Sequence, residues 1–180
     1  MKLMIASDLH GSLLYAEKMA SLYKREGAGR LILLGDLLYH GPRNDLPEGY
    51  DPKGVFTLLN SMKDCLLCVR GNCDADVDQM VLEFPITAES MILYLDGRMV
   101  FATHGDKFNN DTPLLIGKND ILLHGHTHVS AIQDTGSYVY LNPGSIALPK
   151  DGHHSYMVYE DGTFTIKDIS GEALKEWDLS

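Results

Sequence analysis

Residues 3–11 read Leu3-Met4-Ile5-Ala6-Ser7-Asp8-Leu9-His10-Gly11, an apolar run followed at once by polar residues and glycine. A continuously apolar run that stops in this way is typical of a strand buried in a parallel sheet. Residues 30–34 repeat the pattern before Gly35-Asp36, and residues 66–69 repeat it before Arg70-Gly71-Asn72. We therefore predict three buried strands, each followed directly by polar side chains.

Helical patterns separate these strands. Apolar residues recur at helical spacing over residues 12–26, and the pattern stops at Gly27-Ala28-Gly29. Residues 52–63 form the next predicted helix. The order strand, helix, strand, helix, strand predicts an α/β fold that opens with a parallel sheet.

The second half of the chain predicts antiparallel hairpins. Apolar runs occur there in three pairs, and a turn sequence separates the two runs of each pair. A further short strand is predicted between the first two pairs. The predicted strands are residues 91–95, 99–103, 121–124, 131–134, 138–141, 155–159 and 163–169. Asp-Gly turns join the first and last pairs. We expect two stacked sheets with helices outside, in a single domain over residues 1–180. Trp177 and the acidic residues near it suggest a capping element.

Composition limits the possible partners. The 180 residues carry a formal net charge of −10, which gives no counterion-release affinity for nucleic acid and suits a protein that binds cations. Three cysteines argue against a disulfide framework and for a reducing compartment. Asp8 interrupts the N-terminal apolar run, and no run is long enough to span a bilayer. We expect a cytoplasmic protein with no membrane partner.

Metal-competent side chains follow five of the predicted strands: Asp8, His10, Asp36, Asn72, His104, His126 and His128. The carboxyl ends of strands share one edge of an α/β sheet, so these side chains are expected to meet in one crevice. Mixed carboxylate, amide and imidazole ligands suit Mn²⁺, Fe, Zn²⁺ or Co²⁺ better than Mg²⁺ or Ca²⁺. Seven ligands are about right for two ions that share a carboxylate, and two ions about 4 Å apart can clamp a phosphoryl group.

The same residues carry a family resemblance. Asp8-x-His10, Gly35-Asp36, Gly71-Asn72-x-Asp74, His104-Gly105 and Gly125-His126-x-His128 together resemble the five-block pattern of calcineurin-like metallophosphoesterases. His40-Gly41-Pro42-Arg43-Asn44 and Asn142-Pro143-Gly144-Ser145 resemble the YfcE-type branch of small bacterial phosphodiesterases. Each short block alone carries little information, whereas five blocks in order rarely arise by chance.

The resemblance implies a fold, a cofactor and a mechanism. The fold is a four-layer αββα sandwich, with two mixed sheets flanked by helices. Two divalent cations form a binuclear centre, for which we expect Mn²⁺, with Fe, Zn²⁺, Ni²⁺ or Co²⁺ as alternatives. Asp8, His10, Asp36 and His128 would bind the first ion, and Asp36, Asn72, His104 and His126 the second. A hydroxide that bridges the ions would attack phosphorus in line with the leaving oxygen.

Cys73 departs from the wider family pattern, in which a histidine that protonates the leaving group often occupies this position. The YfcE-type branch shares the cysteine. A thiol is a weak proton donor, and general-acid help is worth about 10²–10⁴ in rate. We therefore expect a small phosphodiester substrate with a good leaving group, rather than a simple alkyl phosphomonoester.

Three polar residues beside the predicted ligands have two interpretations each. Asp74 either orients a ligand histidine, which would place it with Asp36, Asn72 and Cys73 among the catalytic residues, or caps a helix. His40 and Arg43 either contact the substrate phosphate or belong to a solvated loop.

Two other functions compete with a phosphodiesterase. One is a phosphomonoesterase of the same fold, which Cys73 disfavours. The other is a non-catalytic scaffold like the retromer subunit that shares this fold but lacks part of the ligand set; here every ligand position is filled. Exposed edges of the predicted hairpins are also compatible with pairing between chains, as in a homo-oligomer.

Overall fold

The structure is a computed structural model that describes residues 1–112 and 116–179. A six-stranded sheet has the order β11-β10-β9-β1-β2-β3, and a five-stranded sheet has the order β4-β5-β6-β8-β7. The first sheet contains β1 (Lys2–Ala6), β2 (Arg30–Leu33), β3 (Leu66–Cys68), β9 (Ser155–Glu160), β10 (Thr163–Asp168) and β11 (Ala173–Asp178). The second contains β4 (Ser90–Leu95), β5 (Arg98–Thr103), β6 (Ile121–Leu123), β7 (Ser130–Asp134) and β8 (Val139–Pro143).

Both sheets are mixed. The strands β1, β2 and β3 run parallel, whereas β9 pairs with β1 in the antiparallel direction. In the other sheet β5, β6 and β8 run parallel, and β4 and β7 are antiparallel edge strands. The predicted stack of two sheets is confirmed, as are the three hairpins. The turn residues Asp96 and Gly97 both have positive φ, as the tight Asp-Gly hairpin turn requires.

Two α-helices follow the predicted pattern. The first, α1 (Leu13–Glu26), begins where the hydroxyl of Ser12 accepts a hydrogen bond from the backbone N–H of Tyr15. It ends at Gly27, whose φ of 64° lies in the left-handed region. The second, α2 (Pro52–Ser61), is shorter than predicted, because the chain tightens into the 3₁₀ turn η1 (Lys63–Cys65). A further 3₁₀ turn, η2 (Asp78–Met80), follows β3.

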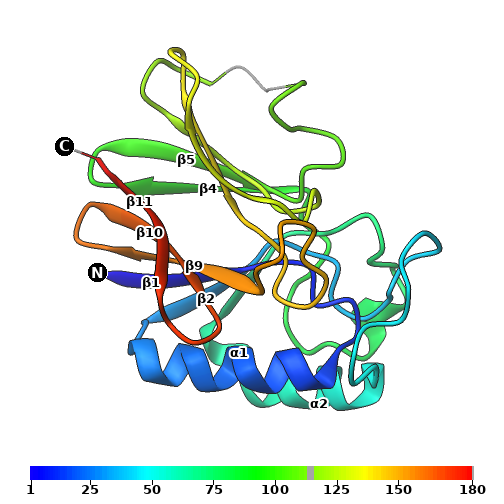
Figure 1. The fold of residues 1–180 in the computed structure, drawn as a ribbon. Helices are drawn as coiled ribbons and strands as arrows, with labels where there is room; N and C mark the ends of the chain where they lie inside the picture. The colour runs from blue at the N-terminus through cyan, green and yellow to red at the C-terminus, as the bar shows by residue number, and fades with distance from the viewer. Residues whose placement is uncertain (113–115, 180) are drawn as a thin grey trace.

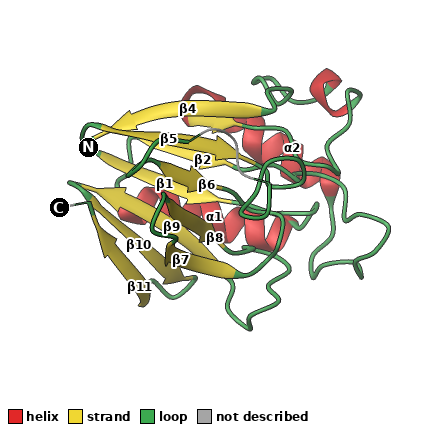
Figure 2. Ribbon diagram, turned by 90° about the horizontal axis from the view of Figure 1, so that it is seen from above, coloured by secondary structure: helices red, strands yellow, loops and turns green. Residues whose placement is uncertain are grey.

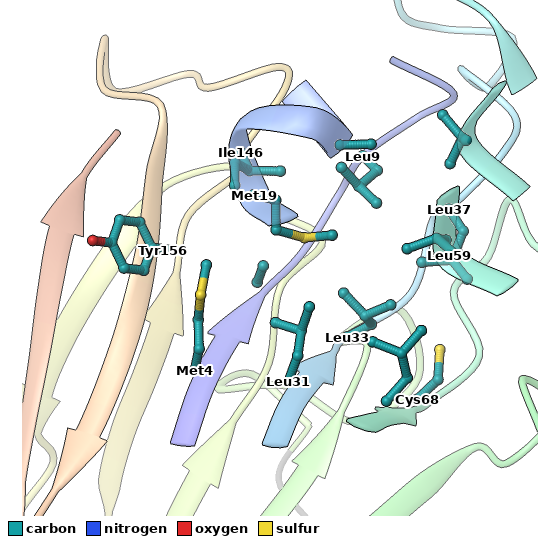
Figure 3. Close-up of a cluster of buried hydrophobic side chains, with 14 of the residues drawn as sticks. Met4, Leu9, Met19, Leu31, Leu33, Leu37, Leu59, Cys68, Ile146 and Tyr156 are labelled. Atoms are coloured by element: carbon teal, nitrogen blue, oxygen red, sulfur yellow. The ribbon is translucent and has the colours of Figure 1, made fainter. Parts of the chain in front are cut away.

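Both α-helices lie on the outer face of the six-stranded sheet (Figure 1). Met19 of α1 packs with Met4, Leu31 and Leu33 of the sheet in one buried cluster, which also includes Leu59 of α2 (Figure 3). Burial on this side and between the sheets explains why β1 and β2 read as continuously apolar runs.

A second cluster fills the space between the two sheets. Ile5 and Ile32 of one sheet pack with Val100, Ile121 and Leu141 of the other. The remaining outer face, on the five-stranded sheet, presents a third cluster that includes Phe101 and Tyr140. In the described part of the chain, loop side chains such as Phe108 and Ile116 pack on this face, rather than an α-helix.

The prediction that Trp177 belongs to a capping element is wrong, because Trp177 lies in strand β11. This strand pairs with β10 and places Trp177 opposite Phe164, with their ring centroids 6.4 Å apart. An edge strand is exposed and tends to carry charged residues, so its sequence resembles a polar tail. Among the described residues, neither α-helix is long and apolar enough to cross a membrane.

Candidate metal centre

The loops that follow the strands gather at one end of the molecule. In both views of the ribbon this end lies opposite the two termini (Figures 1 and 2). The predicted ligands all lie there: Asp8 and His10 after β1, Asp36 after β2, Asn72 after β3, His104 after β5, and His126 and His128 after β6. Parallel strands within each sheet therefore bring side chains from distant parts of the sequence together.

The backbone of this region is strained. Asp8, His10, Asp36, His126 and His128 have φ angles of 60°, 48°, 56°, 64° and 61°, in the left-handed region that L-residues other than Asn and Asp rarely adopt. Backbone hydrogen bonds hold the loops in place, such as His10 N–H to the Asp36 carbonyl at 2.8 Å. Strain of this kind clusters at functional sites.

Gly71 is required by the close approach of two loops. A Cβ atom at Gly71 would lie 2.1 Å from the Asp36 Oδ1 atom and 2.3 Å from the Asp36 backbone nitrogen. Any larger residue would push Asp36 away from the other side chains.

One group of acceptor atoms forms around His10 and His128, whose Nε2 atoms lie 3.1 Å apart. The Nδ1–H of His10 donates to the Tyr39 carbonyl at 2.9 Å, and the Nδ1–H of His128 donates to the Leu148 carbonyl at 2.6 Å. In the neutral rings both Nε2 atoms therefore carry lone pairs. Asp8 Oδ1 lies 3.6 Å and 3.3 Å from these nitrogens, is buried, and accepts no hydrogen bond from any described residue.

A second group forms around His104. Its Nδ1–H donates to the Leu34 carbonyl at 2.7 Å, so Nε2 is the acceptor of the neutral ring. This Nε2 atom lies 3.0 Å from Asn72 Oδ1 and 3.1 Å from His126 Nδ1. Carbonyl and imidazole lone pairs thus face one another at hydrogen-bond distance.

Asp36 joins the two groups. Its Oδ2 atom lies 3.6 Å from His10 Nε2 and 3.4 Å from His104 Nε2, while its Oδ1 atom accepts the backbone N–H of Cys73 at 2.8 Å. Buried acceptors that converge without donors repel one another unless positive charge lies between them. The set of carboxylate, imidazole and amide ligands therefore fits divalent metal ions.

The pKa shifts of His104 and Asp36 agree with a site that binds divalent metal ions. Burial lowers the pKa of His104, but Asp36 and Asp8 raise it overall to about 9. Burial raises the pKa of Asp36, but the hydrogen bond and charge of His104 lower it overall. The site stabilises positive charge, and metal binding releases protons from such a site.

Comparison with known proteins decides the family. The family model of the calcineurin-like phosphoesterase superfamily domain matches residues 1–162. The chain belongs to this superfamily. It is 42% identical over 175 residues to the phosphodiesterase YfcE of Escherichia coli strain K12, which covers 97% of this chain and 95% of that protein. The solved structure of YfcE, described as a phosphoesterase, matches with a TM-score of 0.97 at 40% identity and covers 100% of both chains.

A more distant structure shares the fold alone. The Vps29 protein of Cryptosporidium parvum matches with a TM-score of 0.63 at 16% identity, covering 98% of this chain and 97% of that chain. Family membership confirms the resemblance in the sequence and makes the protein a metal-dependent phosphoric ester hydrolase.

The candidate metal centre of this phosphoesterase opens into a cleft of about 410 Å³. Arg43 lines the cleft, and its contact with a substrate stays a prediction. His40 does not lie among the described residues that line it. The ring of His40 instead makes edge contacts with Tyr39 and Tyr50, at centroid distances of 4.7 Å and 5.4 Å. Packing against two tyrosines and absence from the described lining of the cleft give the predicted substrate contact of His40 no support.

Lys150 lines the same cleft and was not predicted from the sequence. Its backbone N–H donates to the His128 carbonyl at 2.9 Å, which ties it to the ligand loop. Asn44 and Thr127 also line the cleft. The sequence carries no local signal for Lys150, because its position depends on how a distant loop packs against His128.

Asp74 plays neither of its two predicted roles. Its Oδ2 atom accepts the backbone N–H groups of Asp36 at 2.9 Å and Gly71 at 2.7 Å, and its Oδ1 atom accepts that of Leu37 at 2.8 Å. It makes no contact with a ligand histidine in the described residues. This buried carboxylate instead fixes the backbone that carries Asp36.

Cys73 lies beside the ligands. Its Sγ atom is within 4.8 Å of the ligand atoms of His10 and Asp36, and it accepts a hydrogen bond from Asn72 Nδ2 at 3.3 Å. Burial and the charge of Asp36 raise the pKa of the thiol to about 12. In the metal-free protein the thiol is therefore a weaker acid than an ordinary cysteine.

The Asn142-Pro143-Gly144-Ser145 segment holds two ligand loops together. Asn142 is fully buried, and its Nδ2 atom donates to the Gly125 carbonyl at 2.9 Å and to Thr127 Oγ1 at 3.0 Å. Ser145 Oγ donates to the Asp8 carbonyl at 3.0 Å. The sequence motif was recognised by resemblance, but its role in positioning the ligand loops comes from these contacts.

Proposed function

We propose that this phosphoesterase hydrolyses small phosphodiesters with two divalent cations, most suitably Mn²⁺. The observation that carries the proposal is the pair of acceptor groups joined by the Oδ2 atom of Asp36. One cation is assigned to Asp8, His10, Asp36 and His128, and the other to Asp36, Asn72, His104 and His126. Asp36 then neutralises part of the charge of both ions.

Cations held by these residues would supply Lewis acidity and would activate water for attack on phosphorus. The protein's own residues orient the ligands and the substrate. Hydrogen bonds from Nδ1 of His10, His104 and His128 to backbone carbonyls fix the tautomer that leaves Nε2 free. Arg43 and Lys150 line the cleft and supply positive charge to the phosphate oxygens of the substrate.

Two observations favour diesters over monoesters. Cys73 stands beside the proposed ligands, and a thiol is a weaker proton donor than an imidazolium, so it gives little protonation to a departing alkoxide. The relative that is 42% identical over nearly the full length is named a phosphodiesterase. We therefore assign substrates whose leaving group departs without a strong general acid.

The competing scaffold function predicts a degraded metal site. Every predicted ligand position is filled, and the side chains converge in the geometry described above. The likeness to Vps29 concerns the fold alone. The contacts therefore favour the enzyme.

The test combines metal content with hydrolysis of bis(p-nitrophenyl) phosphate. Purified protein loaded with Mn²⁺ should bind two ions per chain and release p-nitrophenol. Asp36→Asn should bind less metal, and its hydrolysis rate should fall by a factor of about 10²–10³, because the negative charge shared by both ions is removed. Asp64→Asn, an exposed residue of η1, is the matched control.

Two results would count against the proposal. Full metal content and full activity in Asp36→Asn would contradict the shared carboxylate. A wild-type protein that binds no metal and hydrolyses nothing would favour the scaffold instead.

A further inference from the structure

A second cavity adjoins the proposed metal centre. Its volume is about 350 Å³, and its described lining includes residues of the loop after β3 and of the loop after β5, but not Cys73 or Arg43. Asn72 lines both this cavity and the catalytic cleft, so the two spaces meet at a proposed ligand. Thr103, the residue before His104, lines the cavity as well.

The charges that line this cavity are largely paired. Lys107 forms an ion pair with Glu89. Arg70 forms an ion pair with Asp76 at 2.8 Å, and its Nε–H donates to the Asp74 carbonyl at 3.1 Å. Among the described residues that line the cavity, a second anion would therefore find no cationic side chain without an ion-pair partner.

Asp106 is the exception. Its carboxylate lines the cavity, is exposed, and makes no hydrogen bond or ion pair with any residue in 1–112 or 116–179. It offers acceptor oxygens, and the paired Lys107 and Arg70 retain further N–H donors. An apolar group would desolvate these polar atoms without replacing their hydrogen bonds. A hydroxyl group can donate to Asp106 and accept from a neighbouring N–H donor.

A phosphodiester carries two substituents, and only one of them leaves during hydrolysis. The catalytic cleft provides space for one, and the cavity beyond Asn72 provides space for the other. At about 350 Å³ the cavity is at the small end of ligand sites, which run from about 300 to 1,000 Å³.

We propose that this cavity binds the retained ester substituent of the substrate, and that this substituent is a neutral group carrying several hydroxyls. Asp106 is the residue that selects it, by accepting hydrogen bonds from the hydroxyls. The inference rests on the proposed phosphodiesterase function and adds the chemical class of one half of the substrate.

The experiment uses three diesters that share p-nitrophenol as the leaving group. Their second substituents are propyl, 2,3-dihydroxypropyl and choline, which are apolar, hydroxylated and cationic. The wild-type enzyme loaded with Mn²⁺ should show a kcat/KM for the dihydroxypropyl ester at least about tenfold above that for the propyl ester. One charge-assisted hydrogen bond accounts for a factor of this size.

Asp106→Ala should remove most of this tenfold preference, mainly through a higher KM for the dihydroxypropyl ester. The substitution should leave folding intact, because the exposed Asp106 side chain forms no hydrogen bond or ion pair with the described residues. Glu176→Ala, an exposed residue of the edge strand β11, removes the same charge at a distant site and should keep the preference.

The outcomes separate the two proposals. Equal kcat/KM values for the propyl and dihydroxypropyl esters, or equal losses for both in Asp106→Ala, would overturn the cavity assignment and leave the phosphodiesterase standing. A preference for the choline ester that Asp106→Ala abolishes would show a cation site and would also overturn it. Failure to hydrolyse any of the three esters would refute the proposed function, and this inference with it.

Discussion

Five of the proposed ligand residues hold left-handed backbone conformations, with φ between 48° and 64°. Each such conformation costs an L-residue roughly 1–2 kcal/mol, somewhat less for Asp. The cost is tolerated because backbone hydrogen bonds between neighbouring loops determine the conformation, such as Gly125 N–H to the His104 carbonyl at 2.9 Å. At the scale of single residues, strained backbone conformations thus position the side chains of the proposed ligands.

This strain predicts an unusual order of stabilities at His126. Both His126→Gly and His126→Ala remove the imidazole, but glycine also relieves the left-handed strain at φ 64°. In chelator-treated protein, the glycine variant should be more stable than the alanine variant by about 1 kcal/mol in urea unfolding. Thr127, which has a negative φ, is the control and should show the opposite order. The same order at both positions would contradict the strain argument.

Cys73 predicts how substrate preference responds to a proton donor. In Cys73→His, an imidazole replaces a thiol whose pKa is about 12, and it can protonate the leaving oxygen near neutral pH. The turnover of an alkyl phosphomonoester should therefore rise relative to that of bis(p-nitrophenyl) phosphate. Cys73→Ser, which supplies no useful acid, should leave the ratio near the wild-type value. An unchanged ratio in Cys73→His would remove the support for this role.

At the scale of elements, one carboxylate at the C-terminal end of α1 makes polar contacts with three strands of the six-stranded sheet. Glu26 accepts hydrogen bonds from Lys167 of β10 at 2.9 Å and 3.0 Å and from the Tyr156 hydroxyl of β9 at 2.7 Å, and it pairs with Lys2 of β1 at 3.0 Å. Burial raises the pKa of Glu26, but these partners lower it overall to about 2.

Glu26 therefore predicts a pH-dependent contribution to stability. A depressed folded-state pKa stabilises the fold above the unfolded value of 4.5, and the contribution disappears as the pH falls through about 2. Glu26→Gln should lower the free energy of unfolding by about 1–2 kcal/mol at pH 7. The difference from wild type should shrink between pH 4.5 and 2. Glu17→Gln, on the exposed face of α1, is the control for urea unfolding at each pH. A difference that stays constant with pH would contradict the assignment.

At the scale of the whole molecule, the proposed metal centre lies where the two sheets meet. Four of the proposed ligands, Asp8, His10, Asp36 and Asn72, follow strands of the six-stranded sheet. The other three, His104, His126 and His128, follow strands of the five-stranded sheet. Between the sheets lies the apolar cluster that includes Ile32 and Ile121. Metal ions at the shared edge would therefore act as links between two halves that otherwise meet through apolar contacts.

This arrangement predicts that metal stabilises the intact protein. Relative to protein in EDTA, Mn²⁺ at about 100 times its dissociation constant should raise the Tm by about 5–10 °C, because the ions bind only the folded chain. The Tm should continue to rise with Mn²⁺ concentration, which thermal unfolding followed by circular dichroism can measure. Sodium chloride of equal ionic strength is the control. Equal Tm values in EDTA and Mn²⁺ would show that the ions do not link the sheets.

Local physical rules predicted many of the strands, the hairpin turns and the edge of the sheet where the proposed ligands meet. The strands β1 and β2 are buried on both faces, so they read as unbroken apolar runs, and the polar residues after them mark the edge where ligands meet. The Asp-Gly turns identify their hairpins because only a few residue types adopt two successive positive φ angles. Edge strand β11 was missed, since an exposed strand loses the apolar pattern that identifies buried ones.

The sequence by itself determined the α/β class, the order of the hairpins and the set of proposed ligands, because these depend on patterns within a few residues of each other. Only the tertiary structure decided what lies around those ligands. Lys150 lines the cleft, and the ring of His40 packs against Tyr50. The carboxylate of Asp74 accepts three backbone N–H groups, and Asp106 lines a second cavity. Each of these outcomes depends on contacts between loops far apart in the chain, and no local pattern encodes how such loops pack.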